Sequence, residues 1–215
     1  MDVNRGLPRW FEGAFAAGGL VALSPVFALC ALLVRLTSSG PAFFRQQRVG
    51  RSGKMFTLYK FRTMVMGQNG DLITARRDRR ITRAGRFLRR LKLDELPQVY
   101  NVLRGDMSFV GPRPEVIDYV DFTNPLWREV LSARPGITDP VALRLRNEEA
   151  LLATALNKDK FYREVIQPYK LNGYVEYLRI KSTRNDLRVI RQTLTAIFLP
   201  GRISPPPTLS EIQIS

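Results

Sequence analysis

The sequence has 215 residues, a length that suits one domain and is too short for two large ones. It carries 34 lysines and arginines against 19 aspartates and glutamates, so its formal charge of +15 favours an anionic partner such as a phospholipid, a nucleotide or a nucleic acid. The absence of histidine and the single cysteine exclude a disulfide within the chain, a cysteine-based zinc site and histidine as a general base. Covalent chemistry must therefore use Asp, Glu, Ser, Thr, Tyr or Lys.

The first predicted element is an uncharged apolar run between Glu12 and Arg35. As a helix this run would measure about 33 Å, roughly the thickness of the hydrocarbon layer of a membrane. Membrane association is therefore favoured over a buried helix of a soluble core. Ser24 and Pro25 stand in the middle of the run, where proline predicts a kink or a break. Arginines flank both ends, so a re-entrant helix that returns to its own side satisfies the positive-inside rule, and a kinked single span is the alternative.

Further along the chain, two strand-like runs within residues 42–62 surround a glycine-containing turn and predict a β-hairpin. Glycines and polar residues over 66–71 predict a loop. Arginines then recur at helical spacing at positions 79, 83, 86 and 90, which predicts a helix with a cationic stripe. From the spacing alone, a solvated face explains this stripe better than a binding surface does.

The C-terminal third predicts an amphipathic helix whose apolar stripe consists of Leu187, Ile190, Leu194 and Ile197. Such a helix packs on a core or lies on a membrane, and the pattern leaves both arrangements open. The proline-rich residues 204–215 predict a tail without a packed role.

The stretch RRLKLDELPQVYNVLRGDMSFVGPRPE, which begins at Arg89, contains the candidate chemistry. It predicts an amphipathic helix with Asp94 and Glu95 at its head and Gly105 at its end. Two interpretations of this acidic pair are open. The pair caps the helix, since anions are favoured at a helix N-terminus, or it takes part in phosphoryl transfer. In the second case a carboxylate attacks phosphorus, Arg89 and Arg113 hold a diphosphate, and Glu95 holds Mg²⁺.

Three segments in chain order resemble a known family. They are SPVFALCALLVRLTSSGPAFFRQQRVGRSGKMFTLYKFRTM, RITRAGRFLRRLKLDELPQVYNVLRGDMSFVGPRPE and RPGIT, and they span most of residues 10–140. In these segments the chain is similar to the bacterial sugar transferases, the monotopic polyprenyl-phosphate phosphoglycosyl transferases. Several distinct motifs in one order are more specific than any single motif.

The residue pattern and the resemblance together predict an α+β, mostly helical protein. We expect a re-entrant (kinked) membrane helix over residues 1–40, then a cytoplasmic catalytic domain over 41–200 with a β-hairpin, a helical catalytic core and amphipathic interface helices, and a tail over 201–215. The resemblance implies an enzyme at the bacterial cytoplasmic (inner) membrane. It would transfer a phospho-sugar from a nucleotide diphosphate sugar, usually a UDP-sugar, to polyprenyl (undecaprenyl) phosphate, with release of UMP and with Mg²⁺ as cofactor.

The resemblance also implies roles for individual residues. Asp94 would be the nucleophile that forms a phosphosugar-aspartyl intermediate, Glu95 would support the metal with Asp94 as a second ligand, and Ser24 with Pro25 would break the membrane helix. The residues that fall where the family places groups around the nucleotide and the phosphates are Lys60, Arg62, Thr63, Arg89, Pro112, Arg113 and Arg134.

The chain departs from the family pattern at two places. It has Asp78-Arg79 where many members carry Asp-Pro, which changes a turn. After residue 138 it continues DPVALRLRNEE in place of the frequent Gly-x-x-Gln-Val. The lining of this part of the donor pocket, and with it the sugar, is therefore not predicted.

An alternative function is a membrane-tethered basic module that binds nucleic acid or anionic lipid, which the net charge and the arginine stripe motivate. The aromatic residues do not form the patterned stacking platform of a single-strand binder, so nucleic acid is not the expected partner. The expected partners are the nucleotide sugar, the polyprenyl phosphate and membrane lipid, and a homo-oligomer is left open.

Overall fold

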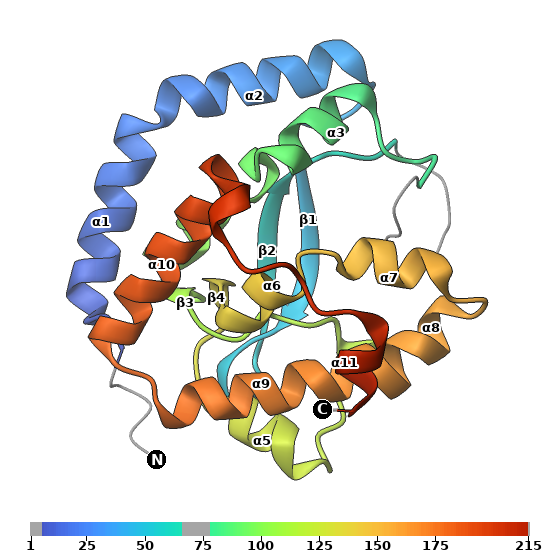
Figure 1. Ribbon diagram of the computed structural model, residues 1–215. Helices are drawn as coiled ribbons and strands as arrows, with labels where there is room; N and C mark the ends of the chain where they lie inside the picture. Colours follow the sequence, from blue (N-terminus) through green and yellow to red (C-terminus); the bar gives the residue numbers. More distant parts are fainter. Residues whose placement is uncertain (1–5, 66–77, 215) are drawn as a thin grey trace.

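The computed structural model describes residues 6–65 and 78–214, and helices predominate in this part of the chain (Figure 1). The helices are α1 (Arg9–Ala22), α2 (Ser24–Thr37), α3 (Arg83–Arg90), α4 (Gln98–Arg104), α5 (Pro125–Leu131), α6 (Pro140–Arg144), α7 (Glu148–Thr154), α8 (Lys158–Phe161), α9 (Gln167–Arg179), α10 (Thr183–Phe198) and α11 (Leu209–Ile214). The strands are β1 (Phe43–Val49), β2 (Met55–Phe61), β3 (Ser108–Val110) and β4 (Gly136–Thr138). Strands β1 and β2 pair antiparallel, and β3 and β4 pair parallel. A mostly helical chain with a β-hairpin is thus confirmed, while the loop predicted over 66–71 lies outside the described residues.

The N-terminal apolar run folds as two helices, α1 and α2, which are bent by 61° relative to each other. The break falls at Leu23, directly before Ser24 and Pro25, which begin α2. Proline has no N–H to continue the ladder of α1, and the Ser24 hydroxyl donates to the carbonyl of Val21 at 2.7 Å. Among the described helices none is long and apolar enough by itself to cross a membrane, but this bent pair meets the criteria as a unit. The break predicted at this position is confirmed.

Each helix of the bent pair presents one face to the body of the protein and another outward (Figure 1). The inward positions are Ala16 on α1 and Cys30 and Val34 on α2, and all three are buried. The outward face is apolar, and its large exposed side chains are Trp10, Phe15, Val21, Leu29, Leu32 and Leu36. Large exposed apolar side chains gathered on two adjoining helices indicate a contact with a membrane or another protein.

Two buried carboxylates fasten the start of α1 to the body. Glu12 accepts a hydrogen bond from the backbone N–H of Phe109 on β3 at 3.0 Å. Asp186 on α10 accepts from the backbone N–H of Leu7 at 2.9 Å and from the Tyr177 hydroxyl. A carboxylate can be buried only when such donors replace its water. The direction in which α1 leaves the body is therefore set by polar contacts.

The β1–β2 hairpin turns through Ser52 and Gly53, whose φ angles are 57° and 75°. Asn101 on α4 bonds to the second strand in two directions: its Nδ2 donates to the carbonyl of Thr57 at 2.7 Å, and its Oδ1 accepts from the N–H of Tyr59 at 3.2 Å. Because Asn101 is buried, these bonds replace its contacts with water. They hold α4 beside the middle of β2.

The arginine-rich helix is shorter than predicted. Helix α3 begins at Arg83, because the Thr82 side chain caps it by accepting a hydrogen bond from the N–H of Gly85 at 2.9 Å. Arg79 therefore lies before the helix. The helical arginines 83, 86 and 90 are exposed, in agreement with a solvated stripe.

Helix α10 confirms the predicted amphipathic helix but presents another face to the body. Val189 is buried, whereas Leu187 and Leu194 are 50% and 51% exposed. Thr193 contributes a polar contact to the buried side, where its hydroxyl lies 2.7 Å from that of Thr138. Half of the predicted apolar stripe is thus on the outside.

The C-terminal segment packs against the body, so the prediction of an unpacked tail is wrong. Helix α11 inserts Ile212 into the hydrophobic cluster formed around α5, α7 and α9. The proline-rich stretch before it is held as well, since the carbonyl of Pro207 accepts from the Asn147 side chain at 3.2 Å. Composition indicated a polar tail, but Ile212 meets the core and the preceding backbone accepts side-chain hydrogen bonds, so the segment is packed.

Candidate active site

Asp94 and Glu95 lie in a single 3₁₀ turn that precedes α4 instead of forming its first turn. Lys92, before this turn, has a left-handed conformation with φ of 56°, which redirects the chain between α3 and the acidic pair. Helix α4 begins only after Pro97, and it ends at Gly105, whose φ is 92°. The predicted end is confirmed and the predicted start is wrong, because proline has no N–H and occupies the position that caps the helix.

Glu95 is held between two cations from different elements. Arg113, in the loop after β3, places Nη2 2.6 Å from Oε1 and Nη1 3.4 Å from Oε2, a two-pronged contact. Lys60, on β2, places Nζ 3.6 Å from the same Oε1. Burial by itself raises the pKa of Glu95, but Arg113 and Lys60 outweigh it and hold that pKa well below its usual range. Glu95 is therefore a carboxylate at neutral pH.

Asp94 has the opposite electrostatic environment. The residue is 7% exposed, and its Oδ1 is buried without a hydrogen-bond partner in residues 6–65 or 78–214. Burial raises the pKa of Asp94 and the charge of Glu95 raises it further, while Lys60 and Lys92 oppose the shift. Adjacent carboxyl groups whose pKa values move apart are typical of catalytic pairs. Oδ1 of Asp94 is therefore a buried acceptor whose hydrogen-bonding capacity is unused by the described residues.

Arg89, near the end of α3, is close enough to Asp94 to oppose the rise of its pKa. Its Nε donates to the Thr63 hydroxyl at 3.0 Å, and its Nη1 lies 3.2 Å from Oε1 of Glu149 on α7. Helix α3 can pack directly against the backbone of Thr63 because Gly85 has no side chain. A Cβ at Gly85 would lie 2.1 Å from the carbonyl oxygen of Thr63. Two predicted phosphate-binding residues, Arg89 and Thr63, are thus adjacent.

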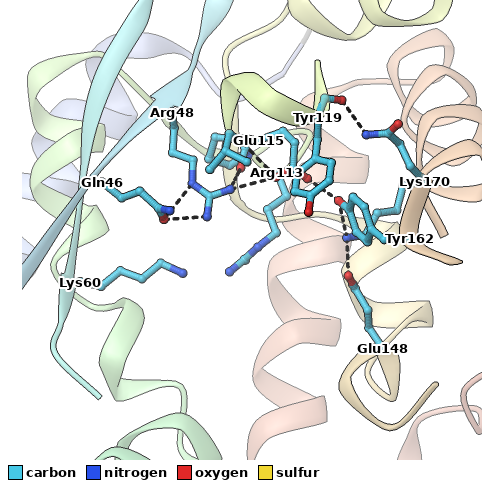
Figure 2. A network of polar contacts seen from close by, with 12 residues as sticks. Gln46, Arg48, Lys60, Arg113, Glu115, Tyr119, Glu148, Tyr162 and Lys170 are labelled. Atoms are coloured by element: carbon cyan, nitrogen blue, oxygen red, sulfur yellow. Dashed lines mark hydrogen bonds and ion pairs between the residues drawn. The ribbon is translucent and has the colours of Figure 1, made fainter. Parts of the chain in front are cut away.

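Arg113 projects from a loop that the backbone of a neighbouring strand holds in place. The N–H of Gly136, at the start of β4, donates to the carbonyl of Pro112 at 2.9 Å, a contact outside the register in which Gly136 pairs with Ser108. Figure 2 shows Arg113 and Lys60 extending from the loop and from β2 toward the same space. The stiffness expected of a Gly-Pro-Arg-Pro run is therefore reinforced by a sheet.

Two of the predicted phosphate-binding arginines have other partners. The guanidinium of Arg62 is buried against carbonyl oxygens that follow α2, at 2.8 Å from Ser38 and 3.3 Å from Gly40. Arg134 donates to the carbonyl of Gly105 at 3.2 Å, beyond the C-terminal end of α4, whereas the acidic pair precedes the N-terminal end. The other predicted binding residues gather around the acidic pair. Phosphate binding by these two arginines stays a prediction.

A metal ion at this site would need ligands from the substrate. The described residues contain no group of three or more His, Cys, Asp or Glu side chains arranged to hold one. Mg²⁺, however, commonly takes one or two carboxylates together with substrate phosphates and water. The buried Oδ1 of Asp94 suits that role, and Glu95 adds a second carboxylate that Arg113 and Lys60 already contact. The residues present therefore fit a magnesium ion that shares its coordination with a bound diphosphate.

Three side chains in this region were not predicted from the sequence. Glu149 pairs with Arg89, and Arg48 pairs with Glu115 at 3.0 Å beside the loop of Arg113. Glu115 could have been predicted from the sequence, because it directly follows the Gly-Pro-Arg-Pro run. Arg48 and Glu149 carry no such local signal, because they reach the site only through the packing of the hairpin and of α7.

Comparison with known proteins adds independent information. The sequence matches the bacterial sugar transferase family over residues 3–200. It is 38% identical over 190 residues to the UDP-glucose:undecaprenyl-phosphate glucose-1-phosphate transferase of Caulobacter vibrioides, with 85% of this chain and 67% of the relative covered. It is 42% identical over 145 residues to the Escherichia coli protein of the same name, with 63% of this chain and 30% of the relative covered. It is 43% identical over 120 residues to the UDP-N-acetylgalactosamine-undecaprenyl-phosphate N-acetylgalactosaminephosphotransferase of Aeromonas hydrophila, with 54% and 28% covered.

The chain thus spans about two thirds of one of these relatives and less than a third of the other two. The family match includes the bent helix pair, the hairpin, the acidic pair and the loop of Arg113. A match of this extent leaves only the first residues and the C-terminal segment outside the family region. The chain belongs to the bacterial sugar transferase family.

Proposed function

We propose that this protein is a membrane-bound phosphoglycosyl transferase that moves a sugar phosphate from a UDP-sugar to undecaprenyl phosphate and releases UMP. The acidic pair carries the proposal: Glu95 is fixed by Arg113 and Lys60, and beside it Asp94 has a buried oxygen that lacks a partner among the described side chains. The names of the relatives support the classes of donor and acceptor.

In the proposed reaction Asp94 is the nucleophile. One of its oxygens attacks the phosphorus that carries the sugar, the bond from this phosphorus to the bridging oxygen breaks, and UMP leaves with that oxygen and the electron pair. A phosphate oxygen of undecaprenyl phosphate then attacks the same phosphorus and restores the carboxylate of Asp94. Because each half-reaction uses one substrate, ping-pong kinetics are expected.

The surrounding cations have separate tasks in this proposal. Arg89 and Arg113 neutralise the phosphoryl oxygens, since a guanidinium can meet two of them at once, and Lys60 adds a point charge. Asp94 and Glu95 would hold Mg²⁺, which when bound neutralises charge on the diphosphate. Glu95 also keeps Arg113 and Lys60 beside Asp94 before the donor arrives.

We place the bent helix pair in the cytoplasmic membrane as a re-entrant element. Both of its ends are fastened to the same body: Glu12 near the start bonds to β3, and Arg62 holds the residues that follow α2. A single span would carry one end to the far side of the bilayer, which these contacts oppose. The apolar outward face supports contact with lipid.

Cysteine labelling tests this topology. In a Cys30→Ser background, we expect Pro8→Cys and Ser39→Cys to react with a membrane-impermeant maleimide from the cytoplasmic side only, because both positions are exposed at the two ends of the pair. Val21→Cys, at the bend, is expected to stay unlabelled in intact membranes. Labelling of the two end positions from opposite sides would instead establish a spanning helix.

The proposed activity is tested with the purified protein, undecaprenyl phosphate, Mg²⁺ and a panel of UDP-sugars. We expect release of UMP from at least one donor, loss of that release when EDTA removes divalent cations, and recovery on addition of Mg²⁺. Absence of UMP release with every donor would contradict the proposal. Salt-sensitive RNA binding that survives loss of both carboxylates, without UMP release, would favour a basic binding module instead.

A further inference from the structure

A chain of largely buried polar side chains connects β1 to α9 beside the loop that carries Arg113 (Figure 2). Arg48, on β1, places Nη1 3.0 Å from Oε1 of Glu115, and Oε2 of Glu115 accepts a hydrogen bond from the Tyr162 hydroxyl. Lys170, on α9, lies with its Nζ 3.5 Å from the same hydroxyl. Three segments far apart in the sequence therefore meet at the carboxylate of Glu115.

Strand β1, which carries Arg48, also forms hydrogen bonds with the backbone that follows Arg113. Nη1 of Arg48 donates to the carbonyl of Pro114 at 3.1 Å. The N–H of Val49 donates to the carbonyl of Glu115 at 2.9 Å. With the preceding residue of the loop bonded to β4, Arg113 is anchored on both sides, and its guanidinium extends to Glu95 from a fixed backbone.

Packing alone does not explain why these positions are polar. The side chains of Arg48 and Glu115 are 17% and 16% exposed, and Tyr162 is buried. Replacing a buried ion pair with apolar residues is often neutral or stabilising, so such a pair is weak evidence for a role in stability. Tyr162 also begins a π-helical stretch that continues to Ile166, a rare distortion that is frequent at functional sites.

We propose that Arg48, Glu115 and Tyr162 form a tether that positions Arg113 for the diphosphate of the donor. The three residues act through the loop, so they are positioning residues. A guanidinium that must meet two phosphate oxygens tolerates little displacement, since a shift of about 1 Å can cost about 100-fold in rate. The identity of the ligand rests on the proposed function, whereas the tether is a property of the loop itself.

A pair of tyrosines provides a matched kinetic test. Tyr162→Phe removes a hydroxyl from the tether, and Tyr119→Phe removes a neighbouring hydroxyl that donates to Asp159 at 2.6 Å. The two rings pack in one hydrophobic cluster with centroids 5.0 Å apart, so both substitutions remove a hydroxyl from the same part of the core. With the UDP-sugar that gives the fastest UMP release, we expect Tyr162→Phe to lower kcat/KM about tenfold and Tyr119→Phe to stay within about twofold of the unmodified protein. Equal losses in the two variants would overturn the tether.

A double-mutant cycle separates positioning from general stabilisation. Glu115→Gln and Arg113→Gln are each expected to lower kcat/KM, and the double variant is expected to match Arg113→Gln within about twofold, because the tether then has no guanidinium to position. A purely structural role of Glu115 would lower activity in both backgrounds by the same factor. Losses that multiply would therefore contradict the proposal.

Hydrogen exchange tests the tether without any substrate. The N–H of Val49 bonds to the carbonyl of Glu115, and the N–H of Val116 lies 3.0 Å from Oε1 of Glu115. We expect both amides to exchange about tenfold faster in Glu115→Gln and in Tyr162→Phe than in Tyr119→Phe. Unchanged exchange would overturn the tether even if the protein released UMP. Faster exchange in a protein that released no UMP would support the tether and contradict the proposed function.

Discussion

Replacing Asp94 with asparagine is expected to abolish UMP release and to leave the protein folded. Asparagine has the shape of aspartate but no anionic oxygen to attack phosphorus, so we expect a loss of about 10³-fold or more. Because Oδ1 of Asp94 has no hydrogen-bond partner within the described part of the chain, the substitution breaks no bond at that atom. UMP release, together with mass spectrometry of protein quenched during reaction with the donor, measures the effect and detects a phosphosugar adduct.

Asp121→Asn is the control for this prediction. Asp121 is an exposed aspartate in the loop before α5, and its partner is the nearby Thr123. We expect its activity to stay within about twofold of the unmodified protein, as for most surface substitutions. Normal turnover by Asp94→Asn would refute the nucleophile assignment, as would an adduct trapped on another side chain.

The elements that could be predicted from the sequence are those whose ends or breaks are set by a single glycine or proline. Gly105 ends α4, the turn at Gly53 closes the hairpin, and Pro25 follows the break between α1 and α2. Each of these depends on the φ angle or the missing N–H of the residue itself. The packed C-terminal segment could not be predicted in this way, because the burial of Ile212 depends on a core edge formed by helices far away in the sequence.

The same distinction applies to the candidate site, where residues close together in the chain could be grouped from the sequence and contacts between distant segments could not. Asp94, Glu95 and Arg113 belong to one continuous stretch, so chain order alone suggested that they lie together. Arg62 and Arg89 looked equivalent in sequence, yet Arg89 lies beside the acidic pair and Arg62 binds carbonyl oxygens after α2. The difference arises from where α3 and the end of α2 approach the strand, which is a tertiary property. The motif pattern therefore predicted that Glu95 and Arg113 lie together, but it did not predict which groups Arg62 and Arg89 contact.

Gly136→Ala is expected to destabilise the protein and to displace the loop of Arg113. A Cβ at this position would lie 2.1 Å from the nitrogen and 2.5 Å from the oxygen of Gly111, and these are backbone atoms beside the β3–β4 pairing. Relief of this overlap requires the loop to move away from β4, at a cost of about 3 kcal/mol. For a chain of this length that cost lowers the thermal midpoint by about 6–12 °C. Thermal unfolding in detergent micelles and UMP release measure the two effects.

Gly201→Ala is the matched control, because no described atom lies within 4 Å of a Cβ at that position. We expect its stability to change by less than about 0.5 kcal/mol. A Gly136→Ala protein with the same thermal midpoint as this control would contradict the close approach of β4 to the loop. Reduced stability with unchanged kcat/KM per folded molecule would show that the approach serves folding alone. Loss of both stability and kcat/KM would instead show that the contact between β4 and the loop positions the Arg113 guanidinium, which faces Glu95.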